Sequence, residues 1–397
     1  MKHLAIFAAC LLLFGAACSD KDDRQPYNPA ELTVTAVYTD ALDLAWTAQP
    51  DAAGYDVEYT SKTGTKTVHA SDTRCELTGL DADTDYSIRI RPQYEDAQGV
   101  WSDPIRVATA TFSVSISSYN VLGVETKAPW APRAGAVEAI IRRADHDPDI
   151  LCLQECKNEP IYSSVQEMLA DTYDVHTIAT SRADAGPALI FWKKNRFELV
   201  KGGYTDMLLG DPKYSSGDFT PNRYAHFVRL REKRSGHELL IYSIHVKTNG
   251  AVSYQKLRYD CISALCPAAV DRASKAGGIP VFIMGDFNNY LTTVDNGVIS
   301  APAACIEGGF TESSAIAREC INLEYKTSGV DMINGKADVR PNGNSRIDYI
   351  FCRYDRPFSV SRYRTVIDFI DGSATDIHKP VPSDHHPVNA VFHLSYH

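Results

Sequence analysis

The chain has 397 residues, of which 44% are apolar and 23% are charged. This composition is close to that of folded globular proteins and excludes a disordered, collagen-like or wholly membrane-embedded chain. Fifty acidic and forty basic residues give a formal net charge of −10. That balance disfavours a protein that grips nucleic acid non-specifically by neutralising phosphates, but it does not exclude an enzyme whose metal site is built from carboxylates.

The charge is spread unevenly along the chain. Residues 28–110 hold fourteen acids and six bases, a net charge of −8, whereas residues 111–397 hold 33 acids and 31 bases, a net charge of −2. At roughly 100–200 residues per domain, the length predicts two or three domains, or one small and one large. The acidic surface therefore belongs to a smaller N-terminal module, and the larger C-terminal part is nearly neutral.

The first residues have the anatomy of an export signal. A basic start at Lys2 precedes an apolar run, Leu4–Phe14, that is too short to span a bilayer. Small residues and then Cys18 follow, so residues 1–17 resemble a bacterial lipoprotein signal, with residues 18–29 as an acidic linker. The resemblance implies that Cys18 is the lipidated N-terminus of a surface-exposed outer-membrane lipoprotein of a Gram-negative cell. The alternative is plain secretion with an incidental cysteine.

Residues 30–110 have the pattern of a small β-sandwich. Alternating runs, such as Leu42, Leu44 and Trp46, are separated by turn residues roughly every eight to twelve positions. Leu80–Tyr86 looks like a tyrosine corner, in which a phenol hydroxyl bonds back to the backbone. The module resembles a fibronectin type III domain, an all-β immunoglobulin-like sandwich. It is either a binding module or a spacer above the membrane, and we favour the spacer, since a fold alone does not give a function.

Residues 111–397 alternate strands with helices. Val137, Ile140 and Ile141 recur at helical spacing, and a second helix is predicted from about Ser253 to Leu265. Short apolar runs typical of buried strands occur before, between and after these helices. Five of them are Ile150–Leu153, Ala188–Trp192, Leu239–Ile244, Val281–Met284 and Ile347–Phe351. This alternation predicts an α/β domain with substantial sheets.

The cysteines carry little functional information. Cys152 and Cys156 flank Glu155, but their spacing and the lack of a second pair argue against a zinc or redox centre. We expect small buried apolar side chains at these positions. An exported compartment permits disulfides, and Cys305–Cys320 is the candidate bridge.

Polar residues stop the apolar runs repeatedly. The set consists of Asn120, Gln154-Glu155, His245, Gly285-Asp286-Phe287-Asn288, Arg346-Ile347-Asp348-Tyr349 and Ser383-Asp384-His385. Strand ends are rigid and open onto loops, so functional groups placed there can converge without burying unpaired charge. Each motif alone is weak, but six of them in this order, each at a strand end, indicate an active site.

This ordered set of motifs resembles the endonuclease/exonuclease/phosphatase superfamily over residues 111–397. The resemblance implies a four-layer α/β sandwich, in which two facing mixed sheets are flanked by helices. It also implies hydrolysis of phosphodiesters or phosphomonoesters with Mg²⁺ or Mn²⁺. A hard cation with oxygen ligands suits this chemistry, because the charge on the phosphoryl oxygens must be neutralised while a water is positioned in line.

The resemblance assigns the metal to three residues. Glu155 matches the principal metal ligand of the family. Asn120 would support the metal or a phosphate oxygen as a neutral ligand. Asp384, next to His385, would be either a carboxylate behind the metal ligands or a carboxylate at a second metal. Magnesium keeps several waters and needs only one or two carboxylates, so this small set suffices.

The resemblance assigns the chemistry to five others. Asp286 would align or deprotonate the attacking water, with Asn288 orienting it. His385 would contact the phosphate, and Asp348 would fix its tautomer through the other ring nitrogen. His245 matches a second phosphate-facing histidine.

The substrate stays open at this point. Arg223 resembles a substrate-binding arginine that clamps a phosphate. Nucleic acid competes with glycan, lipid or inositol phosphates as the phosphate-ester substrate, and we expect a monomer. An alternative of another class is a surface binding or adhesion lipoprotein whose hydrolase fold is inactive. The presence of the whole catalytic set argues against that alternative.

Overall fold

The computed structural model describes residues 32–124, 126–156, 159–177, 188–207, 224–246, 252–292, 294–295, 298–339 and 346–397. Cys18 and Arg223 lie outside these residues. The chain divides into two compact units. Among described residues, the first comprises Ala45–Cys75 and Ser87–Ile105, and the second comprises Thr33–Leu44, Glu76–Tyr86 and Arg106–His397. Within the described residues, no helix is both long and apolar enough to cross a membrane.

The N-terminal region is built from β-strands alone, as predicted. A three-stranded sheet has the order β1 (Thr33–Val37), β2 (Ala41–Ala45) and β5 (Arg74–Thr78). A four-stranded sheet has the order β4 (Gly64–Ala70), β3 (Gly54–Ser61), β6 (Asp85–Gln93) and β7 (Ile105–Ala108). The hydroxyl of Tyr86 accepts the backbone N–H of Asp81 at 3.0 Å, which confirms the predicted tyrosine corner.

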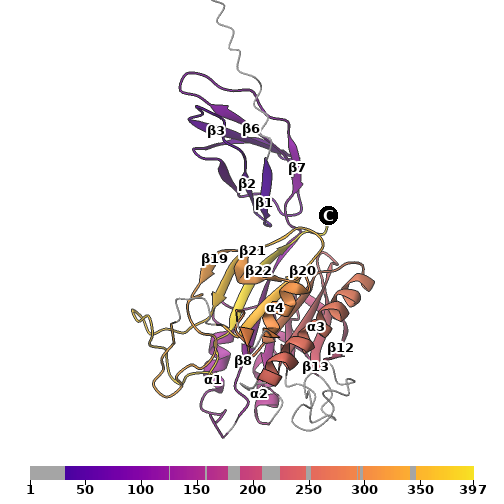
Figure 1. The fold of residues 1–397 in the computed structure, drawn as a ribbon, viewed down its shortest axis with the longest axis vertical. Helices are drawn as coiled ribbons and strands as arrows, with labels where there is room; N and C mark the ends of the chain where they lie inside the picture. Colours follow the sequence, from indigo (N-terminus) through magenta and orange to yellow (C-terminus); the bar gives the residue numbers. More distant parts are fainter. Residues whose placement is uncertain are drawn as a thin grey trace, which may run out of the picture. The chain divides into compact units, whose positions relative to one another are not determined.

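Two large mixed sheets form the C-terminal region (Figure 1). The seven-stranded sheet has the order β10 (Tyr173–His176), β11 (Leu189–Lys193), β9 (Ile150–Gln154), β8 (Phe112–Asn120), β22 (Val388–Leu394), β21 (Phe358–Thr365) and β19 (Ala317–Ile321). The six-stranded sheet has the order β12 (Phe197–Asp206), β13 (Tyr224–Glu232), β14 (Glu238–His245), β15 (Val281–Asp286), β20 (Asp348–Arg353) and β18 (Thr311–Glu312).

The two sheets face each other across one apolar core. Ile116 and Ile150 from the seven-stranded sheet share it with Ile241 from the six-stranded sheet, and all three are fully buried. Phe282 of β15 meets Phe392 of β22 edge to face, with ring centroids 4.9 Å apart. The central strands are therefore covered on both sides, which explains why their sequences read as continuous apolar runs.

Helices cover the outer face of each sheet. α1 (Ala134–Ile141) and α2 (Ile161–Leu169) pack on the seven-stranded sheet, and α3 (Val252–Lys275) and α4 (Ala301–Glu307) pack on the six-stranded sheet. The result is the expected four-layer α/β sandwich (Figure 1). α3 runs ten residues beyond the predicted end at Leu265, because Ala269 and Ala273 continue its buried face.

The predicted Cys305–Cys320 bridge is wrong. Both cysteines are free, as are the other six of the described residues. Cys305 is buried on α4, in the same core as Cys266 of α3, whereas Cys320 is exposed on β19, the edge strand of the other sheet. The two residues thus lie on different elements, α4 against the six-stranded sheet and β19 at the edge of the seven-stranded sheet. The predicted domain boundary near residue 110 stays a prediction.

Candidate active site

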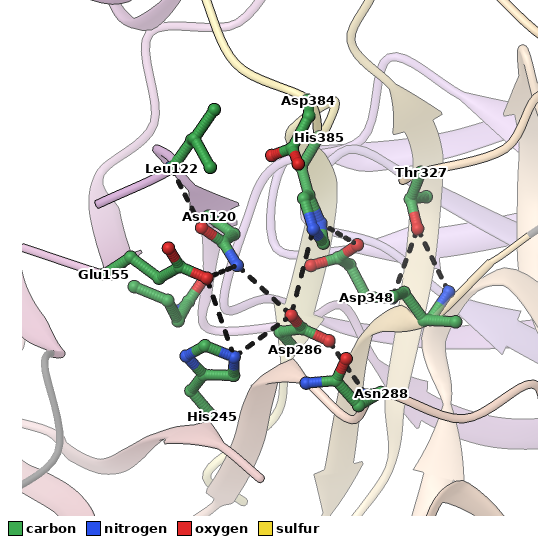
Figure 2. A network of polar contacts seen from close by, with 12 residues as sticks. Asn120, Leu122, Glu155, His245, Asp286, Asn288, Thr327, Asp348, Asp384 and His385 are labelled. Carbon is green, nitrogen blue, oxygen red and sulfur yellow. Dashed lines mark hydrogen bonds and ion pairs between the residues drawn. The ribbon is translucent and has the colours of Figure 1, made fainter. Parts of the chain in front are cut away.

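The sheet registers bring the predicted residues to one end of the two sheets. In the seven-stranded sheet, β8 and β9 are parallel and pair Asn120 with Gln154, so Glu155 follows beside Asn120. In the six-stranded sheet, His245 pairs with Asp286, and Asp286 pairs in turn with Asp348 on β20. Figure 2 shows side chains from both sheets converging there.

Asn120 links two carboxylates from different sheets. Its Nδ2 donates to Glu155 Oε1 at 3.0 Å and to Asp286 Oδ2 at 3.2 Å. Its Oδ1 accepts the backbone N–H of Leu122 at 3.0 Å. In this geometry Asn120 holds the two acids together as a donor, and its predicted role as a metal ligand stays a prediction.

A loop lines Glu155 closely enough to require glycine. The N–H of Gly123 donates to Glu155 Oε2 at 2.7 Å. A Cβ at Gly123 would lie 2.2 Å from the carbonyl oxygen of Glu155, so any other residue would clash. Glu155 and Leu122 both have positive φ, at 64° and 57°, although neither is glycine. Such strained backbone persists where surrounding contacts over-determine it, and it is common at functional sites.

The acids of the six-stranded sheet are deeply buried. Asp286 Oδ2 lies 3.4 Å from His245 Nε2, and its other oxygen accepts the N–H of Asn288 at 2.8 Å. Burial and, second, the nearby Asp348 carboxylate raise the pKa of Asp286. Asn288, at φ 48°, donates through Nδ2 to the carbonyl of Val246, so it supports the Asp286 turn from the β14 side.

His385 and Asp348 form a buried pair. His385 Nδ1 lies 3.0 Å from Asp348 Oδ2, and His385 Nε2 lies 3.9 Å from Asp286 Oδ2. Burial alone would lower the pKa of His385, but Asp348 outweighs it and raises the pKa to about 10. The pair thus holds the imidazole through Nδ1 and leaves Nε2 facing the site (Figure 2), while the predicted contact of His385 with a phosphate stays a prediction.

Asp384 is turned toward a lysine. Its Oδ2 pairs with Lys127 Nζ at 2.5 Å. Its carbonyl accepts the N–H of Val330, which joins it to the loop before β20. Asp384 lies next to His385 (Figure 2), and its predicted contact with a metal stays a prediction.

The donor chemistry fits a hydrated hard cation at Glu155. The Glu155 side chain is 22% exposed, whereas those of Asp286 and Asp348 are 2% and 1% exposed. Magnesium keeps several of its waters, so a water-facing carboxylate suits it better than a buried one. Asp286, Asp348 and His385 also bring ligand atoms within 4.8 Å of one another. Because that set is buried and His385 Nδ1 already bonds Asp348, a hydrated ion fits it poorly.

Several supporting residues were not predicted. Thr327 Oγ1 accepts the N–H groups of Ile347 and Asp348 at 3.0 and 3.2 Å and so fixes the start of β20. Arg133 is buried and donates to the carbonyls of Leu122 and Pro382, which ties the loop after β8 to the segment before β22. The sequence leaves open whether Arg133 covers the mouth of the site or only packs, and no motif marks Thr327.

The chain is similar to two known families and to several solved structures. The endonuclease/exonuclease/phosphatase family matches residues 117–385, and the fibronectin type III domain matches residues 27–108. No curated protein matches the chain. Solved structures with this fold include an endonuclease/exonuclease/phosphatase family protein of Bacteroides thetaiotaomicron, at 22% identity and a TM-score of 0.55, covering 72% of this chain and 98% of that one.

Two further solved structures also share this fold. A mannosyl-6-phosphatase of Bacteroides thetaiotaomicron has 20% identity and a TM-score of 0.51, and the match covers 70% of this chain and 98% of that one. Truncated TDP2 of Caenorhabditis elegans has 17% identity and a TM-score of 0.50, covering 72% and 98%. At these identities the likeness establishes only the fold of the part of the chain that the matches cover, and it leaves the reaction to the site itself.

Proposed function

The chain belongs to the endonuclease/exonuclease/phosphatase family, and on that premise we propose that it is a divalent-metal-dependent phosphoesterase. The observation that carries the proposal is the convergence of Glu155, Asp286 and His385, linked by Asn120 and Asp348, at one end of the sandwich. Every member of the predicted catalytic set is present and within reach of a neighbour in that set. A mannosyl-6-phosphatase with the same fold supports monoesters as substrates, beside the diesters of a nuclease.

The buried residues handle protons and orientation. Asp286 is placed to accept a proton from a water that attacks the phosphorus in line, and its raised pKa brings it nearer the working pH of a general base. His385, charged and held through Nδ1 by Asp348, directs Nε2 toward a phosphoryl oxygen. Asn288 keeps the Asp286 carboxylate oriented through its backbone N–H.

The cation belongs to the water-facing part of the site. Glu155 would hold Mg²⁺ or Mn²⁺ through Oε1, while the N–H of Gly123 keeps Oε2 in place. When bound, the ion neutralises charge on the phosphoryl oxygens. Zinc is disfavoured because the donors on this side are oxygens rather than cysteine and histidine.

The test is hydrolysis by the chain from residue 19 to residue 397. Its substrates are DNA, RNA, phospholipid, inositol phosphates, sugar phosphates and model mono- and diesters, each with Mg²⁺, with Mn²⁺ and with excess chelator. We expect metal-dependent release of product from at least one ester and none in chelator. Undiminished hydrolysis in chelator would exclude the mechanism. Inactivity on the whole panel would favour the binding lipoprotein.

We also propose that the protein is anchored outside the cell through Cys18. The support is the signal-like pattern of residues 1–17, followed directly by this cysteine. Stable anchoring takes more than one acyl chain, and bacterial lipoproteins of this kind carry several on that residue. Cys18→Ser should therefore release the protein from membranes or stall its processing, as fractionation and intact mass would reveal, with the rate on a soluble ester unchanged.

A further inference from the structure

The loop after β8 touches three separate parts of the site. The N–H of Leu122 donates to Asn120 Oδ1, and the N–H of Gly123 donates to Glu155 Oε2. Four residues later, the ammonium of Lys127 reaches Asp384 Oδ2 at 2.5 Å. We call the described residues 121–124 and 126–128 the lip. The lip brings a cation to the edge of a site that is otherwise rich in carboxylates.

The lip is held in place by buried contacts. Arg133 donates to the carbonyl of Leu122 at one side and to that of Pro382, at 2.9 Å, on the other. Lys127 itself closes a turn through its N–H to the carbonyl of Val124 at 2.9 Å. Ser383 Oγ donates to the carbonyl of Asn120 at 2.7 Å, which locks the segment before β22 onto the end of β8. These contacts therefore present Lys127 to Asp384.

The charges around the site require such a cation. Glu155, Asp286, Asp348 and Asp384 contribute four carboxylates, and a phosphate ester is itself an anion. The imidazole of His385 is buried against Asp348, so it offers little attraction at a distance. The side chain of Lys127 is 59% exposed, and an ammonium has three donors, of which Asp384 takes one. The described residues show no other hydrogen bond of this ammonium.

We infer that Lys127 binds the phosphate group of the ester substrate, with Asp384 holding its ammonium in position. This assignment rests on the proposed phosphoesterase function. It makes the Lys127 side chain a phosphate-binding group among the described residues. Lysine acts there as a point charge that attracts and orients the phosphate beside the cation held by Glu155. Lys127 thereby contributes to substrate affinity more than to the chemical step.

The experiment compares Lys127→Met with a matched control. Lys275→Met removes a lysine that also pairs with an aspartate, Asp271 at 2.7 Å, in the last turn of α3. Inorganic phosphate is titrated calorimetrically into the chain from residue 19, with Mg²⁺ and with chelator. Loss of a hydrogen-bonded charge partner should weaken phosphate binding about tenfold in Lys127→Met. Lys275→Met should bind as the wild type does, and Lys127→Arg should keep most of the affinity.

Kinetics separate this inference from the proposed function. On a hydrolysed ester, Lys127→Met should raise KM about tenfold with kcat within about twofold, the pattern of lost uniform binding. Phosphate binding by Lys127→Met as tight as that of Lys275→Met would overturn the inference, even if hydrolysis proceeds. If no ester is hydrolysed while phosphate binding still depends on Lys127, the phosphate-binding role stands and the phosphoesterase proposal falls.

Discussion

The two sheets contribute acids of opposite environments to one site. Glu155, which follows β9 of the seven-stranded sheet, faces water, whereas Asp286 and Asp348 on the six-stranded sheet are enclosed. Environment sets what a carboxylate can do: a solvated one stays charged and can hold a hydrated cation, and a buried one exchanges protons or orients a histidine. The same residue type is thus divided between two tasks by its position in the sandwich. The following predictions test that division.

The buried side should carry the largest effect on turnover. Asp286→Asn removes the proton acceptor, and His385→Ala removes the charged imidazole, so each should lower kcat by about 1,000-fold, within the range of general acid–base catalysis. The measurement is initial rate at saturating metal and substrate, with circular dichroism and thermal unfolding to check the fold. Wild-type rates in either variant would show that the enclosed acids do not take part in the reaction.

The water-facing side should respond to metal concentration instead. Glu155→Gln keeps the shape of the side chain but removes the charge of a metal ligand. Loss of a group that only hydrogen-bonds to a metal ligand weakens metal binding by up to about 100-fold. Loss of the ligand charge itself should therefore raise the metal concentration for half-maximal rate by at least about 100-fold. Titration of Mg²⁺ should restore part of the rate in this variant but not in Asp286→Asn. Equal metal dependence in the two variants would show that Glu155 and Asp286 do not have separate roles in metal binding and proton transfer.

Asp348 lies one contact farther from the reaction than His385. Asp348→Asn keeps a hydrogen-bonding group opposite His385 Nδ1 but removes the charge that favours the imidazolium. We expect kcat to fall about 10–100-fold, as for other groups that orient a functional side chain. The pH profile supplies the specific readout: the basic limb assigned to His385 should move to lower pH. An unchanged profile would mean that Asp348 only packs.

The strand-end residues could be predicted because the first polar residue after a short apolar run marks the end of a buried strand. Glu155 follows Ile150–Leu153, and Asp286 follows Val281–Met284, so pattern and family order together place both at the site. The facing of two sheets came from the family resemblance rather than from periodicity. Thr327 could not be predicted, because it lies on a loop between strands of different sheets and no local pattern records where that loop returns.

Contacts between residues far apart in the sequence also could not be predicted. The contact between Lys127 and Asp384 joins residues 257 positions apart, and it depends on the path of the lip after β8. The neighbourhood of Cys305 depends likewise on how α4 meets α3, which spacing along the chain does not specify. In both cases the sequence shows the residue, but tertiary packing determines which residue it contacts.

Buried histidines without a hydrogen-bonded carboxylate among the described residues should affect stability rather than turnover. Burial lowers the pKa of His146 to about 4 and the pKa values of His226 and His386 to about 3, in contrast to His385. Between pH 6.5 and 4 these three are protonated when unfolded but neutral when folded, so the free energy of unfolding decreases as the pH falls through this range. The raised pKa of Asp286 acts in the opposite direction over part of this range and reduces the net slope.

His385 should act at the other end of the pH scale. Its folded pKa of about 10 exceeds the unfolded value, so its contribution is complete below pH 6.5 and is lost as pH rises toward 10. Denaturant unfolding from pH 4 to pH 9 should therefore show declining stability on both sides of the neutral region. His386→Asn should flatten the acid side alone, and Asp348→Asn should flatten the alkaline side. If His386→Asn left the acid slope unchanged, burial without a partner would not be what distinguishes these histidines from His385.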